Sequence, residues 1–561
     1  MRRSLSLAAL MGIAAAPVQT PAPPPPRLDL TLSPHSATLG VRMVLDAPGF
    51  KAGEPVVRLP LSLVGIPTAR YDGDALRAQD DSGPLPLVQD EEKPTPQGVY
   101  RRWKAARDSV GPVTISFSAP PRAVTAATNN GPLFDLRAEG GGFVGAGVGF
   151  MATPARPGPY RIRLHWDLKD APAGSLGTWS LGTGDVETVA PADLLSFSFY
   201  AVGPIKSAPA APDPNFGLYW LNEPPFPAEQ LGERIRRLYA AMAAFFGEKV
   251  GSYRVFIRQN PYAGTGGTAL AHSFMFGYNP AARPTIDSLQ SLLSHEMAHN
   301  WPAMEGEHGD TAWYSEGTAE YYSMLLSHRA GLLPVDRLLE SLNKKAYDYY
   351  TNPFRALTNP EAARRFWSDP TAQTVPYGRG FLYLARTDDA IRTRSGGKRS
   401  LDDIVRELRR RQVKGEAYGI AQWLDLVGQQ LGPQVAKRDY DAMVSGALLA
   451  APAHRFAPCL RTERHDERLF ELGFARASLG DRVVRGLDPA SEAARAGVRE
   501  GDAIVEVGDL SKIRSDPALP MTLTLRREGQ LVRLSYPPRG AQVEAYRWRR
   551  SSNAPAASCR F

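Results

Sequence analysis

The sequence predicts a multidomain α+β protein. Its 561 residues are enough for three or four units with cores of their own, and 43% hydrophobic with 22% charged residues is an ordinary composition for a globular protein. Short alternating strands broken by Gly and Pro fill residues 27–210, whereas residues 331–456 show helical apolar spacing throughout. We therefore expect a β-sandwich-like unit, a mixed unit at 211–330, a helical unit, a further small unit at 457–540 and a C-terminal tail at 541–561.

The first 26 residues predict an export signal followed by a proline-rich linker. Arg2 and Arg3 precede an apolar run from Leu5 to Ala16, which is too short to span a bilayer. Proline then dominates the stretch from Pro17 to Pro26. No later segment holds about 18 uninterrupted apolar residues, so we expect a periplasmic or secreted protein without stable membrane insertion.

Periodicity predicts individual elements inside these units. Val113 to Ser118 and Tyr160 to Trp166 alternate as half-buried strands do. An amphipathic helix is predicted from Pro227, followed by a strand from Tyr253 to Arg258. These two elements form the entry to the segment that carries the chemistry.

The segment His295-Glu296-Met297-Ala298-His299 is the clearest chemical signal. Residues four apart on a helix lie on one face, so both imidazoles reach one metal ion. Apolar residues at Leu289, Leu293 and Met297 recur at helical spacing and predict that helix. With 9 His and 58 acidic residues in the chain, about 0.015 such matches are expected by chance, so two unrelated surface histidines are the poorer explanation.

Glu316, on a predicted following helix, supplies a third ligand. Zinc held by two His and one Glu keeps a position open for water and lowers the pKa of that water to about 7. Glu296 is then the general base. Glu320 lies one helical turn beyond Glu316 and is placed to orient a ligand histidine through its free ring nitrogen.

These residues resemble a known family. The stretches His-Glu-Met-Ala-His-Asn-Trp and Trp-Tyr-Ser-Glu-Gly-Thr-Ala-Glu-Tyr-Tyr are similar to those of the glycyl aminopeptidases, gluzincin zinc metallopeptidases that carry a C-terminal PDZ domain. The resemblance implies a thermolysin-like catalytic unit at 211–330, Zn²⁺ as cofactor and peptides or proteins as substrates. It also implies that Tyr377 donates a hydrogen bond to the developing oxyanion. Arg379 stands where the family usually has lysine.

The predicted substrate strand departs from the family pattern. The family has Gly-Gly-x-Glu-His beside the zinc, and that glutamate holds the free amine of the substrate. Here the corresponding residues include Gly266, Gly267, Ala271 and His272, and alanine stands in place of the glutamate. An ammonium group buried there without a partner costs several kcal/mol. Strict aminopeptidase specificity is therefore not implied, although a carboxylate from another segment is an alternative partner. His308, in the stretch between the second histidine and the third ligand, is expected to be a loop residue, and the alternative is that it touches the substrate.

Residues 457–540 resemble a PDZ domain. Leu472, Gly473 and Phe474 are similar to its carboxylate-binding loop, and Ala496 to Ile504 to its turn-and-strand signature. Such a domain pairs an extended peptide with a sheet edge and binds the terminal carboxylate on backbone N–H groups. The alternative is a packing module whose groove is filled by residues 541–561 of the same chain.

The two cysteines, Cys459 and Cys559, flank the C-terminal unit. In an oxidising compartment they predict a disulfide that closes a loop of about 100 residues, which stabilises by about 4 to 5 kcal/mol in the chain-entropy model. The net charge of +8 is spread over short separate runs. Nucleic-acid binding needs a concentrated basic patch with aromatic residues, so we expect no nucleic-acid partner.

Two functions from different classes follow from the sequence. The first is an exported zinc metallopeptidase, aminopeptidase-like by family resemblance and altered at Ala271. The alternative is a non-catalytic peptide-binding protein that uses the PDZ-like groove while the zinc site is vestigial.

Overall fold

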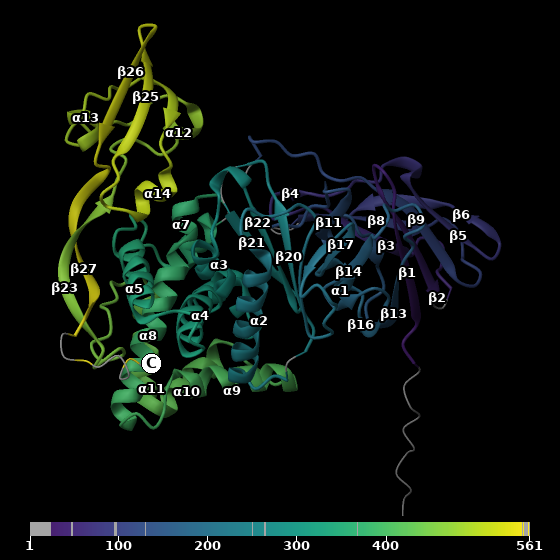
Figure 1. The fold of residues 1–561 in the computed structure, drawn as a ribbon, viewed down its shortest axis with the longest axis horizontal. Coiled ribbons are helices and arrows are strands. Elements are labelled where there is room, and N and C mark those ends of the chain that lie inside the picture. Colours follow the sequence, from purple (N-terminus) through teal and green to yellow (C-terminus); the bar gives the residue numbers. More distant parts are fainter. Residues whose placement is uncertain are drawn as a thin grey trace, which may run out of the picture.

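A computed structural model describes residues 24–46, 49–94, 98–128, 131–249, 251–262, 265–366 and 368–551, together with residues 554, 559 and 561. Residues 1–23 of the predicted export signal and linker lie outside the described residues. N-terminal sheets occupy one end of the molecule, helices fill the centre, and a small C-terminal unit stands on a long ribbon at the other end (Figure 1).

Three sheets make up the N-terminal region. Their strand orders are β16-β13-β1-β2-β9-β5-β6, β12-β3-β8-β7 with β4 on β3, and β10-β11-β17-β14-β15. Inward residues alternate along the strands, as in β13, where Tyr160, Ile162 and Leu164 are buried. The elements are β1 (Arg27–Pro34), β2 (Leu39–Asp46), β3 (Pro55–Leu63), β4 (Ile66–Pro67), β5 (Leu76–Asp80), β6 (Gly83–Leu85), β7 (Leu87–Glu91), β8 (Gly98–Ala105), β9 (Val113–Ala119), β10 (Arg137–Glu139), β11 (Gly142–Ala146), β12 (Thr153–Pro154), β13 (Pro159–Trp166), β14 (Leu176–Trp179), β15 (Gly182–Thr183), β16 (Val186–Pro191), α1 (Asp193–Ser196) and β17 (Phe199–Gly203).

A five-stranded mixed sheet follows, with the order β18-β19-β20-β22-β21. The central strands β19, β20 and β22 are parallel, whereas β21 pairs antiparallel with β22 and forms an edge. The helices α2, α3 and α4 belong to the same region, and α3 contacts both β21 and β22. The bounds are β18 (Lys206–Ala208), β19 (Phe216–Trp220), α2 (Ala228–Phe245), β20 (Tyr253–Gln259), β21 (Thr265–Leu270), β22 (Ser273–Tyr278), α3 (Ile286–Ala298) and α4 (His308–Arg329).

Seven helices are described between residues 335 and 444, and five of them, α5, α8, α9, α10 and α11, share one continuous core with the mixed sheet and its helices. Helix α8 packs along α4. Residues Glu316 to Ser327 of α4 are therefore buried. The bounds are α5 (Val335–Tyr350), α6 (Asn359–Arg365), α7 (Pro370–Gln373), α8 (Val375–Ser395), α9 (Leu401–Lys414), α10 (Ile420–Leu431) and α11 (Pro433–Val444).

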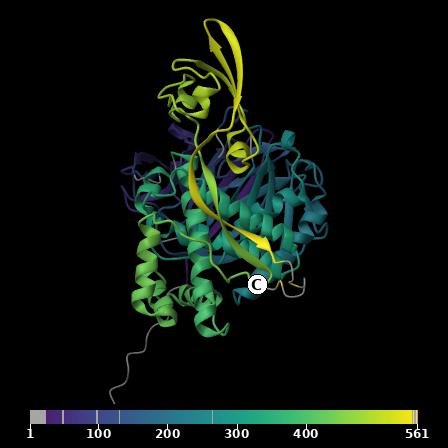
Figure 2. The same cartoon turned by 90° about the vertical axis from the view of Figure 1, so that its left-hand side faces the viewer.

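The C-terminal unit has its own core and stands on a two-stranded ribbon. In the ribbon, β23 pairs antiparallel with β27, and the separate sheet β24-β25-β26 lies beyond it. Figure 2 shows the ribbon running across the helices toward the C-terminus. The bounds are β23 (Leu460–Phe470), α12 (Ser478–Asp481), α13 (Glu492–Arg495), β24 (Ala503–Val507), α14 (Leu510–Ser515), β25 (Met521–Arg527), β26 (Gln530–Tyr536) and β27 (Arg539–Arg550).

The ribbon corrects the expectation of a C-terminal tail at 541–561. Residues 541–550 lie in β27, and the Asn343 side chain of α5 both donates to and accepts from the backbone of Trp548, at 3.0 and 2.7 Å. Trp548 itself is buried, with its ring 6.3 Å from that of Phe381. These ribbon residues are therefore engaged by β23 and the helical core, and they do not fill a groove of the C-terminal unit.

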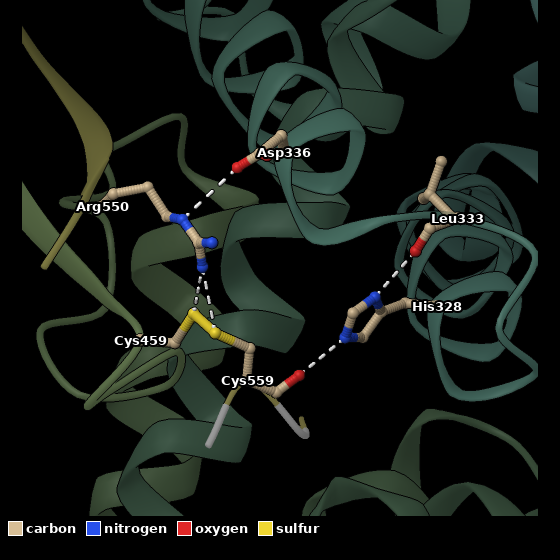
Figure 3. The surroundings of a disulfide bond; sticks show 6 residues. All are labelled: His328, Leu333, Asp336, Cys459, Arg550 and Cys559. Atoms are coloured by element: carbon tan, nitrogen blue, oxygen red, sulfur yellow. Dashed lines mark hydrogen bonds and ion pairs between the residues drawn. A yellow bond between two sulfur atoms is a disulfide. The ribbon is translucent and has the colours of Figure 1, made fainter. Parts of the chain in front are cut away.

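A disulfide joins Cys459 to Cys559 at the base of the ribbon (Figure 3). The Arg550 guanidinium lies 3.0 Å from both sulfur atoms and also pairs with Asp336 at 3.3 Å. The Cys559 carbonyl is 2.7 Å from Nε2 of His328 on α4. The disulfide thus fixes the chain terminus against the helices of the core.

In the described residues, no helix combines the length and apolar character needed to cross a membrane.

Candidate metal centre

The predicted metal ligands lie on two helices, α3 and α4, and their side chains converge. Thr285 caps α3 with a capping box, and the helix then carries His295 and Glu296 to its end, where His299 is the C-cap residue. Glu316 lies on α4 and is 9% exposed. Among the described residues this is the one group of three or more His, Cys, Asp or Glu side chains with converging ligand atoms.

The distances fit a tetrahedral ion. Nε2 of His295 lies 3.0 Å from Nε2 of His299, and these atoms lie 3.3 and 3.5 Å from Oε2 of Glu316. Ligands about 2.05 Å from a tetrahedral zinc are about 3.3 Å from one another. In addition, the buried Oε2 of Glu316 accepts no hydrogen bond from the part of the chain that is described. The three atoms therefore fit a divalent cation.

Carboxylates set the charge of this cluster. Burial lowers the pKa of the His295 imidazole, but Glu316 and Glu320 outweigh it and raise the pKa to about 10. Burial likewise raises the pKa of Glu316, while the two histidines bring it well below its ordinary value. The carboxylates therefore favour a positive charge in this cluster. A proton on His295 supplies that charge when no metal is bound.

Glu320 and Lys345 stand behind His295. Oε1 of Glu320 lies 3.4 Å from Nδ1 of His295, on the side of the ring opposite the metal-facing nitrogen. The Lys345 ammonium donates to the Glu320 carboxylate at 2.7 Å. Burial raises the pKa of Glu320, but Lys345 and His295 outweigh it, and the pKa falls to about 2. Glu320 is thus an anion that fixes the ring orientation.

Glu296 lies beneath the edge strand β21. A Cβ placed on Gly267 would come within 2.4 Å of Cγ and 2.7 Å of Oε1 of Glu296, so only glycine permits this approach. Burial raises the pKa of the Glu296 carboxyl, against the lowering effect of the neighbouring histidines. A carboxylate whose pKa is raised toward neutrality is suited to exchange protons.

Tyr377 belongs to the first turn of α8. Its ring is nearly parallel to that of His295, with a centroid distance of 5.6 Å. Burial, and then the nearby Glu316, raise the pKa of its hydroxyl well above the ordinary value. The hydroxyl therefore keeps its proton and is a hydrogen-bond donor beside the metal ligands. Arg379 is buried beyond it and donates to Asn359 and two backbone carbonyls.

A cavity of about 760 Å³ opens over these residues, which we call the metal cavity. Its walls come from three regions: residues 131–134 of the N-terminal sheets, the edge strand β21 with the turn after it, and the helices α3, α4 and α8. The hydroxyl of Thr268 accepts from Leu133 N at 2.8 Å, and Ala271 N donates to Phe197 O at 3.4 Å. The N-terminal sheets therefore hold the substrate strand in place.

The residues predicted for the substrate strand all line the metal cavity, but they do not all lie in the strand. Gly266 and Gly267 belong to β21, whereas Ala271 and His272 form the turn that leads to β22. His272 has a φ of 49°, a left-handed conformation that side chains other than Gly, Asn and Asp rarely adopt. Ala271, where the resemblance implies a glutamate in the family, therefore lies just after the end of the strand.

Sequence reasoning missed several residues of the metal cavity. Glu248 lines it but is already engaged, because it accepts from Trp301 Nε1 at 2.6 Å and pairs with Arg409 at 3.3 Å. His308, expected in a loop, begins α4 with its ring 4.6 Å from that of Phe366, and burial lowers its pKa. No local pattern marks these residues, since their partners lie far away in the sequence.

The predicted carboxylate loop lies in the C-terminal unit. Leu472 and Phe474 are buried in that unit's core, and Gly473 has a φ of 81° with Ser491 too close for a side chain. Among the described residues, no acceptor receives a hydrogen bond from the N–H groups of this loop. The chain then turns at Ala475 into α12 and does not continue as an extended edge strand.

Residues 288–374, which contain the metal ligands, match the family model described as M61 glycyl aminopeptidase. The predicted family resemblance is confirmed. No curated protein matches the sequence. Among solved structures, an aminopeptidase N family protein from Idiomarina loihiensis matches with a TM-score of 0.65 at 14% identity, over 95% of this chain and 99% of that chain. Native leukotriene A4 hydrolase from Saccharomyces cerevisiae gives a TM-score of 0.45 at 17% identity, over 76% of this chain and 68% of that chain.

The first of these likenesses shows that the chain shares a multidomain α+β fold with an aminopeptidase N family protein. The match of residues 288–374 to the peptidase family supports a peptidase.

Proposed function

We propose that the protein is an exported zinc-dependent metallopeptidase whose site accepts internal or N-blocked peptide bonds. The observation that carries this proposal is the set of three ligand atoms at tetrahedral spacing, with a buried carboxylate, Glu296, beside them and under an open strand edge. His295, His299 and Glu316 would hold the ion. Zinc bound there supplies a Lewis acid that polarises the scissile carbonyl and lowers the pKa of a water molecule.

Residues of the chain perform the proton transfers. Glu296 accepts a proton from the attacking water and later returns it to the leaving amine, so the same carboxyl serves as base and acid. The Tyr377 hydroxyl donates to the oxygen that becomes negative. Among the described strands, β21 lies at the edge of its sheet, where an extended peptide would pair with the backbone near Gly267, and the lack of a side chain at Gly267 lets that peptide approach Glu296.

Specificity for a free N-terminus has no support in the charges of the metal cavity. In the described residues, its acidic side chains are Glu248, Glu296 and Glu316. The first is paired with Arg409, the second is the proposed base, and the third is the proposed ligand. An ammonium group would therefore find no free carboxylate at the turn that contains Ala271.

The substitution Glu296→Gln tests the mechanism. We expect it to reduce kcat by on the order of 10³-fold or more, because the water loses its base, while zinc content by atomic emission stays at one ion per chain. The change Glu92→Gln, in the N-terminal region, is a matched control that should leave both unchanged. Full hydrolysis by Glu296→Gln, or well-folded wild-type protein that binds no zinc, would show the mechanism to be wrong.

A panel of matched peptides with free and acetylated N-termini tests specificity. We expect comparable kcat/KM values for both members of each pair. A preference of 100-fold or more for free amines would identify a strict aminopeptidase and contradict our inference. No turnover of any peptide by zinc-loaded protein would favour the alternative of a peptide-binding protein with a vestigial site.

Export and a PDZ-like role complete the proposal. The disulfide at the ribbon base supports export, because disulfides persist in oxidising compartments such as the periplasm. The unbonded N–H groups at Leu472, Gly473 and Phe474 support capture of a peptide carboxylate, although the turn into α12 leaves little strand for peptide pairing.

A further inference from the structure

A second cavity, of about 780 Å³, lies among α2, α3, α4 and α5. It shares no lining residue with the metal cavity, although both use α3 and α4. Six serines line it, and we call it the serine cavity; they are Ser288, Ser291, Ser294, Ser323, Ser327 and Ser341.

The floor of the serine cavity is polar and buried. Gln290 is 9% exposed, and its amide nitrogen donates to Ser294 at 2.8 Å. The hydroxyls of Ser294 and Ser327 are 3.1 Å apart. The carbonyl oxygen of Gln290 has no hydrogen-bond partner among the described residues. Buried amide oxygens are nearly always paired in folded proteins, so this acceptor indicates a missing donor.

The rim of the cavity carries a cation that forms no ion pair among the described residues, since Glu233, one turn before it on α2, is paired with Arg236. Most basic residues around it are neutralised: Arg234 pairs with Asp287, and Arg337 with Glu340. In the described chain, Arg237 forms no ion pair, and its guanidinium reaches only the carbonyl of Ala330 at 3.5 Å. A ligand anion is the charge that this position lacks.

Apolar side chains complete the cavity. Met324 is buried in the wall, and Leu332 and Leu333 lie in the turn between α4 and α5. They offer contact to a carbon skeleton between the polar floor and the cationic rim. Lys345 also lines the cavity, but its ammonium is held by Glu320.

We propose that the serine cavity binds a small hydroxylated organic anion, such as a sugar acid or a sugar phosphate. Its carboxylate or phosphate pairs with Arg237, a hydroxyl donates to the free oxygen of Gln290, and the serines satisfy further hydroxyls. The site shares no lining residue with the metal cavity, although one of its lining residues, Lys345, contacts the support of the metal centre through the Glu320 carboxylate.

Calorimetric titration of the full chain tests this proposal. The probes are gluconate, glucose 6-phosphate, neutral glucose and inorganic phosphate, each added to zinc-loaded and to chelator-treated protein. We expect one molecule of gluconate or glucose 6-phosphate to bind per chain in both preparations. Glucose lacks the anion and phosphate lacks the hydroxylated skeleton, so each should bind at least tenfold more weakly.

Three variants identify the site. Arg237→Ala and Gln290→Leu should each weaken binding of the preferred anion at least tenfold, whereas Arg438→Ala removes an exposed arginine on α11 and should leave it unchanged. Arg237 is exposed, so its replacement keeps the test valid even if Gln290→Leu fails to fold. Absence of binding by both anions, equal binding of glucose, or full affinity in Arg237→Ala would overturn the proposal.

Discussion

Helices α4 and α8 carry two buried charge clusters, and the two differ in completeness. In the first, both carboxylate oxygens of Asp388 are satisfied: they accept from Tyr321, from Arg392 and from the backbone N–H of Leu401, and the carboxylate forms an ion pair with Arg455. In the metal centre, at an earlier turn of both helices, Oε2 of Glu316 accepts no hydrogen bond within the described chain.

This difference separates structure from function. A buried charge is tolerated when its partners are fixed in the fold, and the Asp388 cluster meets that condition by itself. The metal centre meets it only with an added cation, whether a proton on His295 or a metal ion. The carboxylate with the unpaired oxygen is therefore the one beside the converging histidines, and the Asp388 carboxylate is a structural lock, although one nitrogen of Arg455 has no hydrogen-bond partner among the described residues.

The largest effect is expected at the complete cluster. Asp388→Asn leaves the buried Arg455 without its anion and should lower the free energy of unfolding by about 3 to 5 kcal/mol at pH 7, measured with denaturant. Zinc stoichiometry in the folded variant should not change. A loss below about 1 kcal/mol would remove the distinction between the two clusters.

Low pH should remove the difference in stability between wild type and Asp388→Asn. Burial raises the pKa of the Asp388 carboxyl, but Arg455 and Arg392 outweigh it, so the folded value lies below the ordinary 3.8. Its contribution is complete above the unfolded pKa and disappears as pH falls through the folded pKa. Wild type and Asp388→Asn should therefore converge in stability only when the pH falls below the ordinary value of 3.8.

The metal centre should respond to pH in a different way. Without metal, His295 holds a proton up to about pH 10, whereas zinc needs the neutral ring. Zinc binding should release one proton, and its apparent affinity should rise about tenfold per pH unit from pH 6 to 8. Competition with a chromogenic chelator measures this, after correction for the chelator's own titration, and a flat profile would contradict it.

Lys345→Met tests the support behind the metal ligands. Loss of the ammonium that fixes Glu320 should weaken zinc binding by about 10- to 100-fold, and it should also lower the free energy of unfolding, because the buried Glu320 anion loses its cation. Lys344→Met is the matched control, because its exposed ammonium pairs with Asp348 away from the centre. Equal zinc affinity in both variants would mean that Glu320 needs no support.

The smallest effect is expected at Ala271→Glu. A carboxylate at the turn beside β21 would pair with a free amine, so the ratio of kcat/KM for free over acetylated peptides should rise about tenfold. Ala271→Gln controls for side-chain size. If both variants give the same ratio, the charge of this position does not determine specificity.

The sequence predicted that the proposed metal ligands converge, because a four-residue spacing on one helix is local information. His295, His299 and Glu316 needed only two helices in succession. Lys345, Arg409 and Glu248 were missed because their contacts join segments that are far apart, and their types are also those of ordinary surface residues.

Errors in the predicted strands arose where a strand carries many charged residues and where a strand ends in a turn. Val113 to Ser118 and Tyr160 to Trp166 lie in β9 and β13, where alternation is regular. The β27 strand was missed because Arg547, Arg549 and Arg550 surround its buried Trp548, and such a run resembles a tail. Ala271 and His272 were expected in a strand, but the hairpin turns there in a left-handed conformation at His272.

The disulfide at the base of the ribbon makes the distal unit part of a covalent ring. Chain residues 459 to 559 leave the core along one strand and return along its neighbour, and the two ends are bonded to each other. A single proteolytic cut within that ring would therefore release no fragment. The nicked molecule would separate on a denaturing gel only after reduction.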